Sequence, residues 1–250
     1  MNKNFILEIS NLFVSLNDKK IINDFNLNIS PGEVHVIMGP NGVGKSTLAR
    51  FLAGEYSNYF FSGSVLFDGF DLFKLSKNEI SLNGLFLSFQ NPVDIPGVSN
   101  LDFFKSFLNY RRKFKGIEPL DNIAFLNELK TYMKSLSMDE KLLNRYLNVD
   151  FSGGEKKKNE VLQMLLLKPS LAIFDEIDSG LDVDSLKNVF NSINCFRKKN
   201  SSLLIITHYT RILDYIDIDF IHVMCNGKIV KTGKTELLND INNNGYFQFT

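Results

Sequence analysis

The chain has 250 residues, of which 44% are hydrophobic and 22% are charged, and its 28 basic side chains balance 28 acidic ones. This length suits one large α/β domain, or a core domain that carries a smaller lobe. The neutral balance favours neither nucleic acid nor an anionic bilayer as a partner. No apolar run approaches the ~20 residues that span a bilayer, so we expect no direct membrane insertion.

The N-terminus leads directly into a strand-like segment, Phe5 to Ile9, without the pattern of a signal or transit peptide. Cys195 and Cys225 are too few for a disulfide framework or a four-ligand metal site, and we expect reduced thiols. The abundance of Asn, Lys, Ile and Phe, with no Trp, indicates an AT-rich genome, as in a plastid or a reduced symbiont. These features predict a soluble protein of a plastid stroma or a bacterial cytoplasm.

Residues 5–38 alternate short β-rich pieces with turn residues, which predicts an antiparallel layer that leads into a buried strand, Val34 to Met38. The next nine residues fit the phosphate-loop pattern G-x-x-x-x-G-K-[ST]. Glycines keep side chains away from backbone N–H groups that can surround an anion. Lys45 is then expected to reach the outer phosphates, and the hydroxyl of Ser46 to hold Mg²⁺ at the start of a helix.

Beyond this loop, Ser64–Phe67 and Leu85–Phe89 read as strands, and Gln90 follows the second of them. The two prolines of residues 92–96 argue against regular structure there. From about residue 99 to 147 apolar residues recur at helical spacing, which predicts an all-helical lobe inserted into the α/β core.

Phe151–Glu155 opens a helix that Pro169 should stop. Ser152, Gly153 and Gly154 at this helix N-terminus suit contact with a γ-phosphate that is held by another site. An ordinary N-cap is the alternative interpretation of the same three residues.

Leu171–Glu176 reads as an apolar strand that ends in two carboxylates, which strand alternation should point to opposite sides. Asp175 then suits a Mg²⁺ site, and Glu176 suits activation of a water molecule. Residues 179–182 should form a turn that caps the next helix, and a further strand, Leu203–Thr207, ends at His208. Taken singly, the two acids and the histidine are equally compatible with structural roles.

The order of these segments resembles that of the ATP-binding cassette (ABC) ATPases: Walker A, Q-loop, signature, Walker B with its glutamate, D-loop and H-loop. Within them the chain resembles the Suf-type iron–sulfur cluster assembly ATPases (the SufC family, Ycf16 when plastid-encoded). The residues that carry this finer resemblance are Gln90–Ser99, Phe151–Glu160, Asp178–Asp182 and Thr207–Tyr215.

Two departures stand out. Many cassettes stack an aromatic ring on adenine at about the position of Leu16, which is not aromatic, so base recognition should be loose. Ile177 stands where a small polar residue is common, and no physical reason for this is evident.

The resemblance implies a fold of class α/β: a P-loop NTPase core of ABC type with an antiparallel β layer (residues 1–98 and 148–250) and a helical subdomain (residues 99–147). It implies Mg²⁺-dependent hydrolysis of ATP, with Glu176, His208, Gln90 and Lys45 as catalytic residues and Ser46, Gln90 and Asp175 at the metal. The nucleotide-binding residues it implies are Gly39, Pro40, Asn41, Gly42, Val43, Gly44, Lys45, Ser46, Thr47, Ser152, Gly153, Gly154 and Asp182.

The same resemblance implies a transient homodimer of ATPase heads, formed on ATP binding, and SufB-like and SufD-like scaffold partners that dock near Gln90 and the Pro92–Pro96 segment. Two other functions stay open at this point. The general cassette motifs equally allow the energy-coupling subunit of a membrane transporter. A DNA-associated cassette protein is disfavoured by the neutral charge and by the absence of a long coiled-coil insertion.

Overall fold

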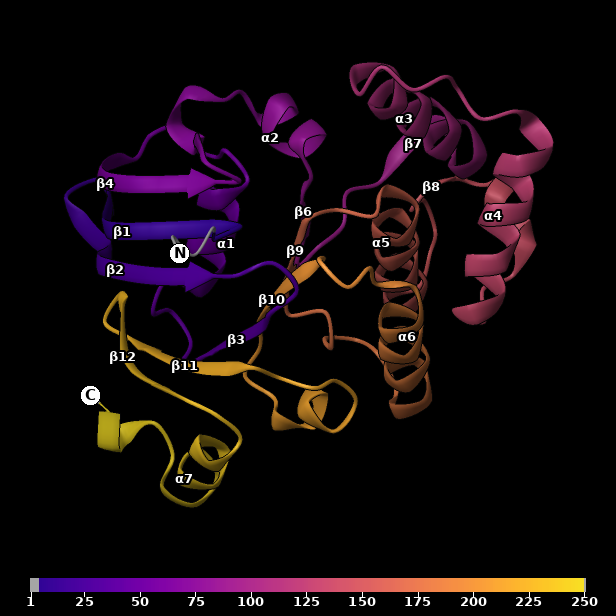
Figure 1. Ribbon diagram of the computed structural model, residues 1–250. Coiled ribbons are helices and arrows are strands. Elements are labelled where there is room, and N and C mark those ends of the chain that lie inside the picture. Colours follow the sequence, from indigo (N-terminus) through magenta and orange to yellow (C-terminus); the bar gives the residue numbers. More distant parts are fainter. Residues whose placement is uncertain (1–4, 250) are drawn as a thin grey trace. The chain divides into compact units, whose positions relative to one another are not determined.

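The computed structural model describes residues 5–249, apart from the side chain of residue 196. The chain forms two compact units (Figure 1). The first unit comprises residues 1–87, 169–176 and 198–250, and the second comprises residues 88–168 and 177–197. The predicted subdomain at residues 99–147 lies within the second unit, which extends beyond it on both sides. The 99–147 boundary therefore stays a prediction.

The first unit is built on a six-stranded sheet with the order β12-β11-β3-β10-β9-β6. β11, β3, β10 and β9 run parallel to one another, and β12 pairs antiparallel with β11. In this register Ile206 of β10 lies opposite both Ile37 of β3 and Asp175 of β9. The carboxyl ends of three parallel strands are therefore level, which is where ligands bind in open α/β sheets. The strands are β3 (Val34–Met38), β6 (Leu85–Ser88), β9 (Leu171–Asp175), β10 (Ser202–Ile206), β11 (Phe220–Cys225) and β12 (Lys228–Gly233).

A second sheet of the first unit is antiparallel, with the order β2-β1-β4-β5. β1 continues through Leu16, well beyond the predicted strand-like segment Phe5 to Ile9, with an irregularity at Asn11 (φ 49°). α1 packs with this sheet and with β9 and β10 in one apolar core that includes Phe51, Phe67 and Ile173. The elements are β1 (Leu7–Leu16), β2 (Lys19–Ile29), α1 (Lys45–Leu52), β4 (Phe60–Phe67) and β5 (Phe70–Asp71).

The rest of the first unit is helical. α2 starts with a capping box between Ser76 and Glu79, and it ends at Gly84 in the left-handed conformation. The elements are the 3-10 helix η1 (Leu72–Lys74), α2 (Lys77–Asn83), the 3-10 helix η3 (Thr210–Asp214), α7 (Glu236–Asn244) and the 3-10 helix η4 (Phe247–Phe249).

Among its described residues, the second unit consists of four α-helices, one 3-10 helix and one short pair of strands. Two expectations were wrong in detail. Helical structure ends at Ser135 and is followed by a 3-10 turn and a strand, and the segment with two prolines contains β7, which includes Pro96. β7 pairs with β8 only at its two ends, which accommodates the missing donor of the proline. The elements are β7 (Ile95–Ser99), α3 (Asn100–Phe114), α4 (Asn122–Ser135), the 3-10 helix η2 (Glu140–Asn144), β8 (Tyr146–Leu147), α5 (Gly153–Leu167) and α6 (Val183–Phe196).

Within the described part of the chain, no helix combines the length and the apolar character needed to cross a membrane.

Candidate functional site

The phosphate loop connects the buried strand β3 to α1, as the pattern predicted. Gly44 is the N-cap of α1 and has φ 106°, and a Cβ atom there would lie 2.9 Å from the Ile21 carbonyl oxygen. Glycine is therefore required both by the backbone conformation and by the close approach of β2. Because Gly44 offers no side chain to cap the helix, the first amides of α1 remain available to an anion.

Lys45 is folded over the loop that precedes it. Its side chain is only 6% exposed, and its Nζ donates hydrogen bonds of 2.8 Å to the carbonyls of Gly39 and Pro40. Burial lowers the pKa of Lys45, while the carboxylates of Glu176 and Asp175 oppose that change. The ammonium group thus lies at the loop with two acids of the β9 end nearby, where it can neutralise phosphate charge.

Ser46 and Asp175 meet across the site. The Ser46 hydroxyl donates a 3.0 Å hydrogen bond to Oδ1 of Asp175, and the carboxylate is 2% exposed at the end of β9. A hydroxyl and a carboxylate are the hard oxygen ligands that Mg²⁺ prefers, usually together with water and substrate phosphate. The donor set therefore fits the magnesium ion that the motif implies.

Glu176 differs from the strand geometry expected of it. β9 ends at Asp175, and Glu176 has φ 53°, so alternation along a strand does not set its direction. Its backbone N–H donates to the Ile206 carbonyl at 2.9 Å, which ties it to the end of β10. Its Oε1 lies 3.4 Å from Nδ1 of His208. A left-handed non-glycine residue costs about 1–3 kcal/mol and is common at functional sites.

The remaining predicted residues belong to the second unit. Ser152 caps α5, and its backbone N–H and hydroxyl form a capping box with Glu155. Asp182 caps α6 by accepting from the Ser185 amide, a bond that lowers the pKa of Asp182. The interpretation of Ser152 as an N-cap is therefore confirmed, and so is the expected cap at Asp182. Gln90 follows β6, as expected.

The structure therefore brings Lys45, Ser46, Asp175, Glu176 and His208 together at the carboxyl edge of the first unit's sheet. Five predicted residues lie on the second unit: Gln90, Ser152, Gly153, Gly154 and Asp182.

Sequence reasoning missed how α5 holds the segment that contains Gln90. The buried Glu160 carboxylate accepts from the Ser88 hydroxyl and the Phe89 amide, both at 2.8 Å, and Lys157 Nζ donates to the Phe89 carbonyl at 2.6 Å. Burial raises the pKa of Glu160, and Lys157 opposes this rise. No pattern in the sequence predicts these contacts, because a run of charges in a helix usually indicates a solvated face.

Three buried asparagines of the second unit form a hydrogen-bonded cluster. Asn159 of α5 donates to the side-chain oxygens of Asn100 and Asn148, and Asn148 donates to the Val93 carbonyl at 2.9 Å. The helix that begins with the serine–glycine–glycine turn is therefore hydrogen-bonded to the chain on both sides of Gln90.

Comparison with known proteins agrees with this site. The model of the ABC transporter family matches residues 22–179, which include the phosphate loop, Gln90, Ser152 and Glu176. The chain belongs to this family. It is an ABC ATPase, and it hydrolyses ATP.

The relatives of this ABC ATPase place it with the SufC and ycf16 type. It is 47% identical to the probable ATP-dependent transporter ycf16 of Trieres chinensis, with 98% of each chain covered. It is 48% identical to the probable ATP-dependent transporter SufC of Escherichia coli, with 96% of this chain and 97% of the relative covered.

A solved structure supports the fold of the ABC ATPase. The dimeric post-hydrolysis state of the ATP-binding cassette MJ0796, bound to ADP and Pi, superposes with a TM-score of 0.77 at 18% identity, covering 91% of this chain and 98% of the other. The predicted fold class, an ABC-type P-loop core with an antiparallel β layer and a helical subdomain, is confirmed.

Proposed function

We propose that this ABC ATPase is the subunit that powers a SufBCD-like iron–sulfur cluster assembly scaffold, and that two copies close over two ATP molecules. The observation that carries the proposal is the 48% identity to SufC, which covers 96% of this chain. The printed names of the relatives call them probable transporters, so the energy-coupling subunit of a membrane transporter is the competing function.

In this proposal the residues of the first unit carry the chemistry. Lys45 and the amides of the α1 N-terminus bind the phosphates, and Ser46 and Asp175 would hold Mg²⁺, which supplies charge neutralisation between phosphate oxygens. Glu176 accepts a proton from the attacking water, and His208, 3.4 Å from that carboxylate, fixes its position. Gln90 would bind the γ-phosphate and the metal.

The glycines of the signature support a site completed by another copy. A Cβ atom at Gly153 would meet nothing within 4 Å, and one at Gly154 would meet its nearest atoms at 3.7 Å, an ordinary contact distance. Neither glycine has positive φ. Because neither the backbone nor the neighbouring atoms require glycine here, we infer that the space serves a nucleotide held by a second copy.

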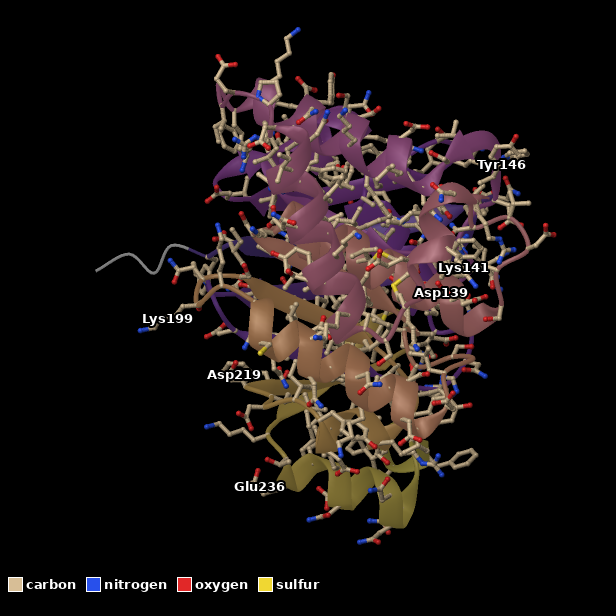
Figure 2. The ribbon with its side chains drawn as sticks, turned by 90° about the vertical axis from the view of Figure 1, so that its right-hand side faces the viewer. Asp139, Lys141, Tyr146, Lys199, Asp219 and Glu236 are labelled. Carbon is tan, nitrogen blue, oxygen red and sulfur yellow. The ribbon has the colours of Figure 1, made fainter. Side chains whose placement is uncertain are left out.

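An exposed apolar strip beside Gln90 supports the docking of a scaffold protein. We name it the β7–β8 strip, and Tyr146, one of its members, projects from the surface in Figure 2. Val93 is 68% exposed and precedes β7, and Ser99 of β7 pairs with Tyr146 of β8. Exposed apolar groups gathered in one place mark interaction sites. The members of the strip are Phe89, Val93, Ile95, Val98 and Tyr146.

The contacts beneath this strip offer a route from docking to catalysis. The Val93 carbonyl accepts a hydrogen bond from the Asn148 side chain, and the Asp94 carboxylate accepts a 2.6 Å hydrogen bond from Lys156 of α5. A partner that moves residues 93–98 would therefore pull on the helix whose first turn contains Gly153 and Gly154.

The test is affinity capture of SufB-like and SufD-like proteins from the native source by the tagged full chain. Wild type should retain both proteins, and Val93→Glu should lose them, because a charge in the apolar strip costs desolvation. Ile123→Glu is the matched control, since Ile123 is 73% exposed on α4 outside the strip. Recovery of an integral permease, with neither scaffold protein, would favour the transporter function instead.

A further inference from the structure

The imidazole ring of His208 is not held beside Glu176 by a hydrogen bond at its inner nitrogen. Nδ1 of His208 lies 3.4 Å from Oε1 of Glu176, but this buried nitrogen has no hydrogen-bond partner in the described structure. The His208 side chain is 31% exposed, so the core of the first unit does not enclose it either. The orientation of the imidazole toward the carboxylate therefore depends on packing.

The next residue, Tyr209, supplies a packing contact of this kind. The centroids of the His208 and Tyr209 rings lie 3.9 Å apart, and the two ring planes are inclined at 41°. Rings at this separation are in van der Waals contact, so each limits the rotation of the other. The tyrosine ring thus packs against the same imidazole whose Nδ1 lies next to Glu176.

The backbone of Tyr209 is fixed on both sides, which gives its ring a defined position. Its N–H donates a 2.9 Å hydrogen bond to the hydroxyl of Thr207, a fully buried residue directly after β10. Tyr209 is also the N-cap of η3, and Ile212 of that helix is fully buried. Tyr209 itself is 49% exposed, so loss of its ring removes little core packing.

Glu176 starts from the same strand end. Its backbone N–H donates to the carbonyl of Ile206, the last residue of β10, at 2.9 Å. Glu176, His208 and Tyr209 all belong to the first unit. The side chains therefore form a continuous row at the carboxyl edge of the sheet, from the carboxylate through the imidazole to the phenol ring.

We propose that Tyr209 is a positioning residue for ATP hydrolysis: its ring holds the imidazole of His208 beside Glu176. Tyr209 acts through His208 and makes no contact with the nucleotide. The inference rests on the catalytic roles proposed above for His208 and Glu176, and it adds a residue to the same site. Because the ring affects only the orientation of His208, its loss should slow hydrolysis without weakening ATP binding.

The test compares Tyr209→Leu, which removes the aromatic ring, with Tyr209→Phe, which keeps it. Tyr209→Leu should lower kcat by about 3–10-fold, as expected for one ring contact, while the Kd of a non-hydrolysable ATP analogue stays within about twofold. Tyr209→Phe should stay near wild type in both quantities. Tyr110→Leu is the matched control, since Tyr110 is 61% exposed on α3 of the second unit. A wild-type kcat in Tyr209→Leu would overturn the proposal.

A double-variant cycle separates this inference from the function on which it rests. His208→Ala should slow turnover more than Tyr209→Leu does, and adding Tyr209→Leu to His208→Ala should slow it by less than about twofold further. A full further decrease in the double variant would refute the positioning role but leave His208 in the mechanism. Wild-type turnover by His208→Ala would refute the catalytic role of the histidine, and the positioning role with it.

The orientation of His208 can also be measured directly, because the chain has only 3 histidines. In histidine-selective NMR spectra, the ring current of Tyr209 shifts the signal of the His208 ring, which is identified by its loss in His208→Ala. This signal should move in Tyr209→Leu and stay close to its position in Tyr209→Phe, while the signals of His35 and His222 do not move. An unmoved His208 signal would contradict the proposal. Movement of all three signals would also contradict it, because that result indicates a general structural role.

Discussion

The Ser46 hydroxyl donates a 3.0 Å hydrogen bond to the Asp175 carboxylate, which joins the first turn of α1 to the end of β9. If these oxygens hold Mg²⁺, Ser46→Ala should raise the magnesium concentration for half-maximal ATPase activity by about 10-fold or more. Ser46→Thr keeps the hydroxyl and should stay near wild type. A titration of activity with Mg²⁺ at constant ATP measures this, and equal midpoints for Ser46→Ala and wild type would contradict the assignment.

Glu176→Gln should leave ATP binding intact and slow hydrolysis by about 10²-fold or more, because glutamine cannot accept the proton of the attacking water. Steady-state turnover and nucleotide titration on the same preparation separate the two effects. Glu236→Gln, an exposed carboxylate at the start of α7, is the control and should turn over normally. Wild-type turnover by Glu176→Gln would remove the glutamate from the mechanism.

A buried histidine pair should make the stability of the protein depend on pH. Nδ1 of His35 lies 2.9 Å from Nε2 of His222, and Nδ1 of His222 lies 2.9 Å from the Thr232 hydroxyl. Burial and the neighbouring His35 lower the pKa of His222 to about 3, and burial lowers the pKa of His35 although Glu33 opposes this. Both rings are therefore neutral in the folded state near neutral pH.

The direction of this pH dependence follows because only the unfolded state takes up protons on these histidines. Below the unfolded pKa of about 6.5, unfolding binds protons, so stability falls as the pH falls. When the pH falls from about 7.5 to about 5.5, the free energy of unfolding should decrease by about 1.4 kcal/mol because of His222 alone. Urea titrations at both values should show this loss in wild type and a smaller one in His222→Gln. Equal unfolding free energies at the two pH values in wild type would refute it.

Arg111 is a buried cation of α3 whose Nε lacks a hydrogen-bond partner in the described structure. Burial lowers its pKa. Replacing a largely buried guanidinium group, whose Nε lacks a partner, with an apolar side chain of similar length removes a desolvation penalty. Arg111→Met should therefore stabilise the protein by about 1 kcal/mol or more.

Urea unfolding measures the Arg111→Met effect, and exposed Lys113→Met should change stability by less than about 0.5 kcal/mol. A lower free energy of unfolding in Arg111→Met would show that the guanidinium group stabilises the folded protein, and it would contradict this prediction.

The parts of the site that a local pattern encodes were predictable from the sequence. The strand before Gly39, the start of a helix at Lys45 and the cap at Ser152 each depend on residues within one turn or strand. The meeting of Ser46 with Asp175 was expected from the motif order, although 129 positions separate the two residues.

Other features could not be predicted, because they depend on tertiary contacts between residues of ordinary type. The left-handed Glu176 is held by a hydrogen bond to β10, and strand alternation gave the wrong geometry for it. Lys157 and Glu160 are buried although their neighbours resemble a solvated face.

The central claim, that two copies share each ATP, is tested most directly by mixing two inactive variants. Lys45→Ala removes phosphate binding, and Gly154→Asp places a carboxylate in the signature at a position where a Cβ atom meets its nearest neighbours at an ordinary contact distance of 3.7 Å. Each variant alone should lack ATPase activity. In a mixed dimer, one of the two ATP sites combines the intact phosphate loop of one copy with the intact signature of the other. Half of the dimers in an equimolar mixture are mixed, so the mixture should regain about a quarter of the wild-type rate. A mixture as inactive as its components, with Gly154→Asp still folded and binding ATP, would contradict the account.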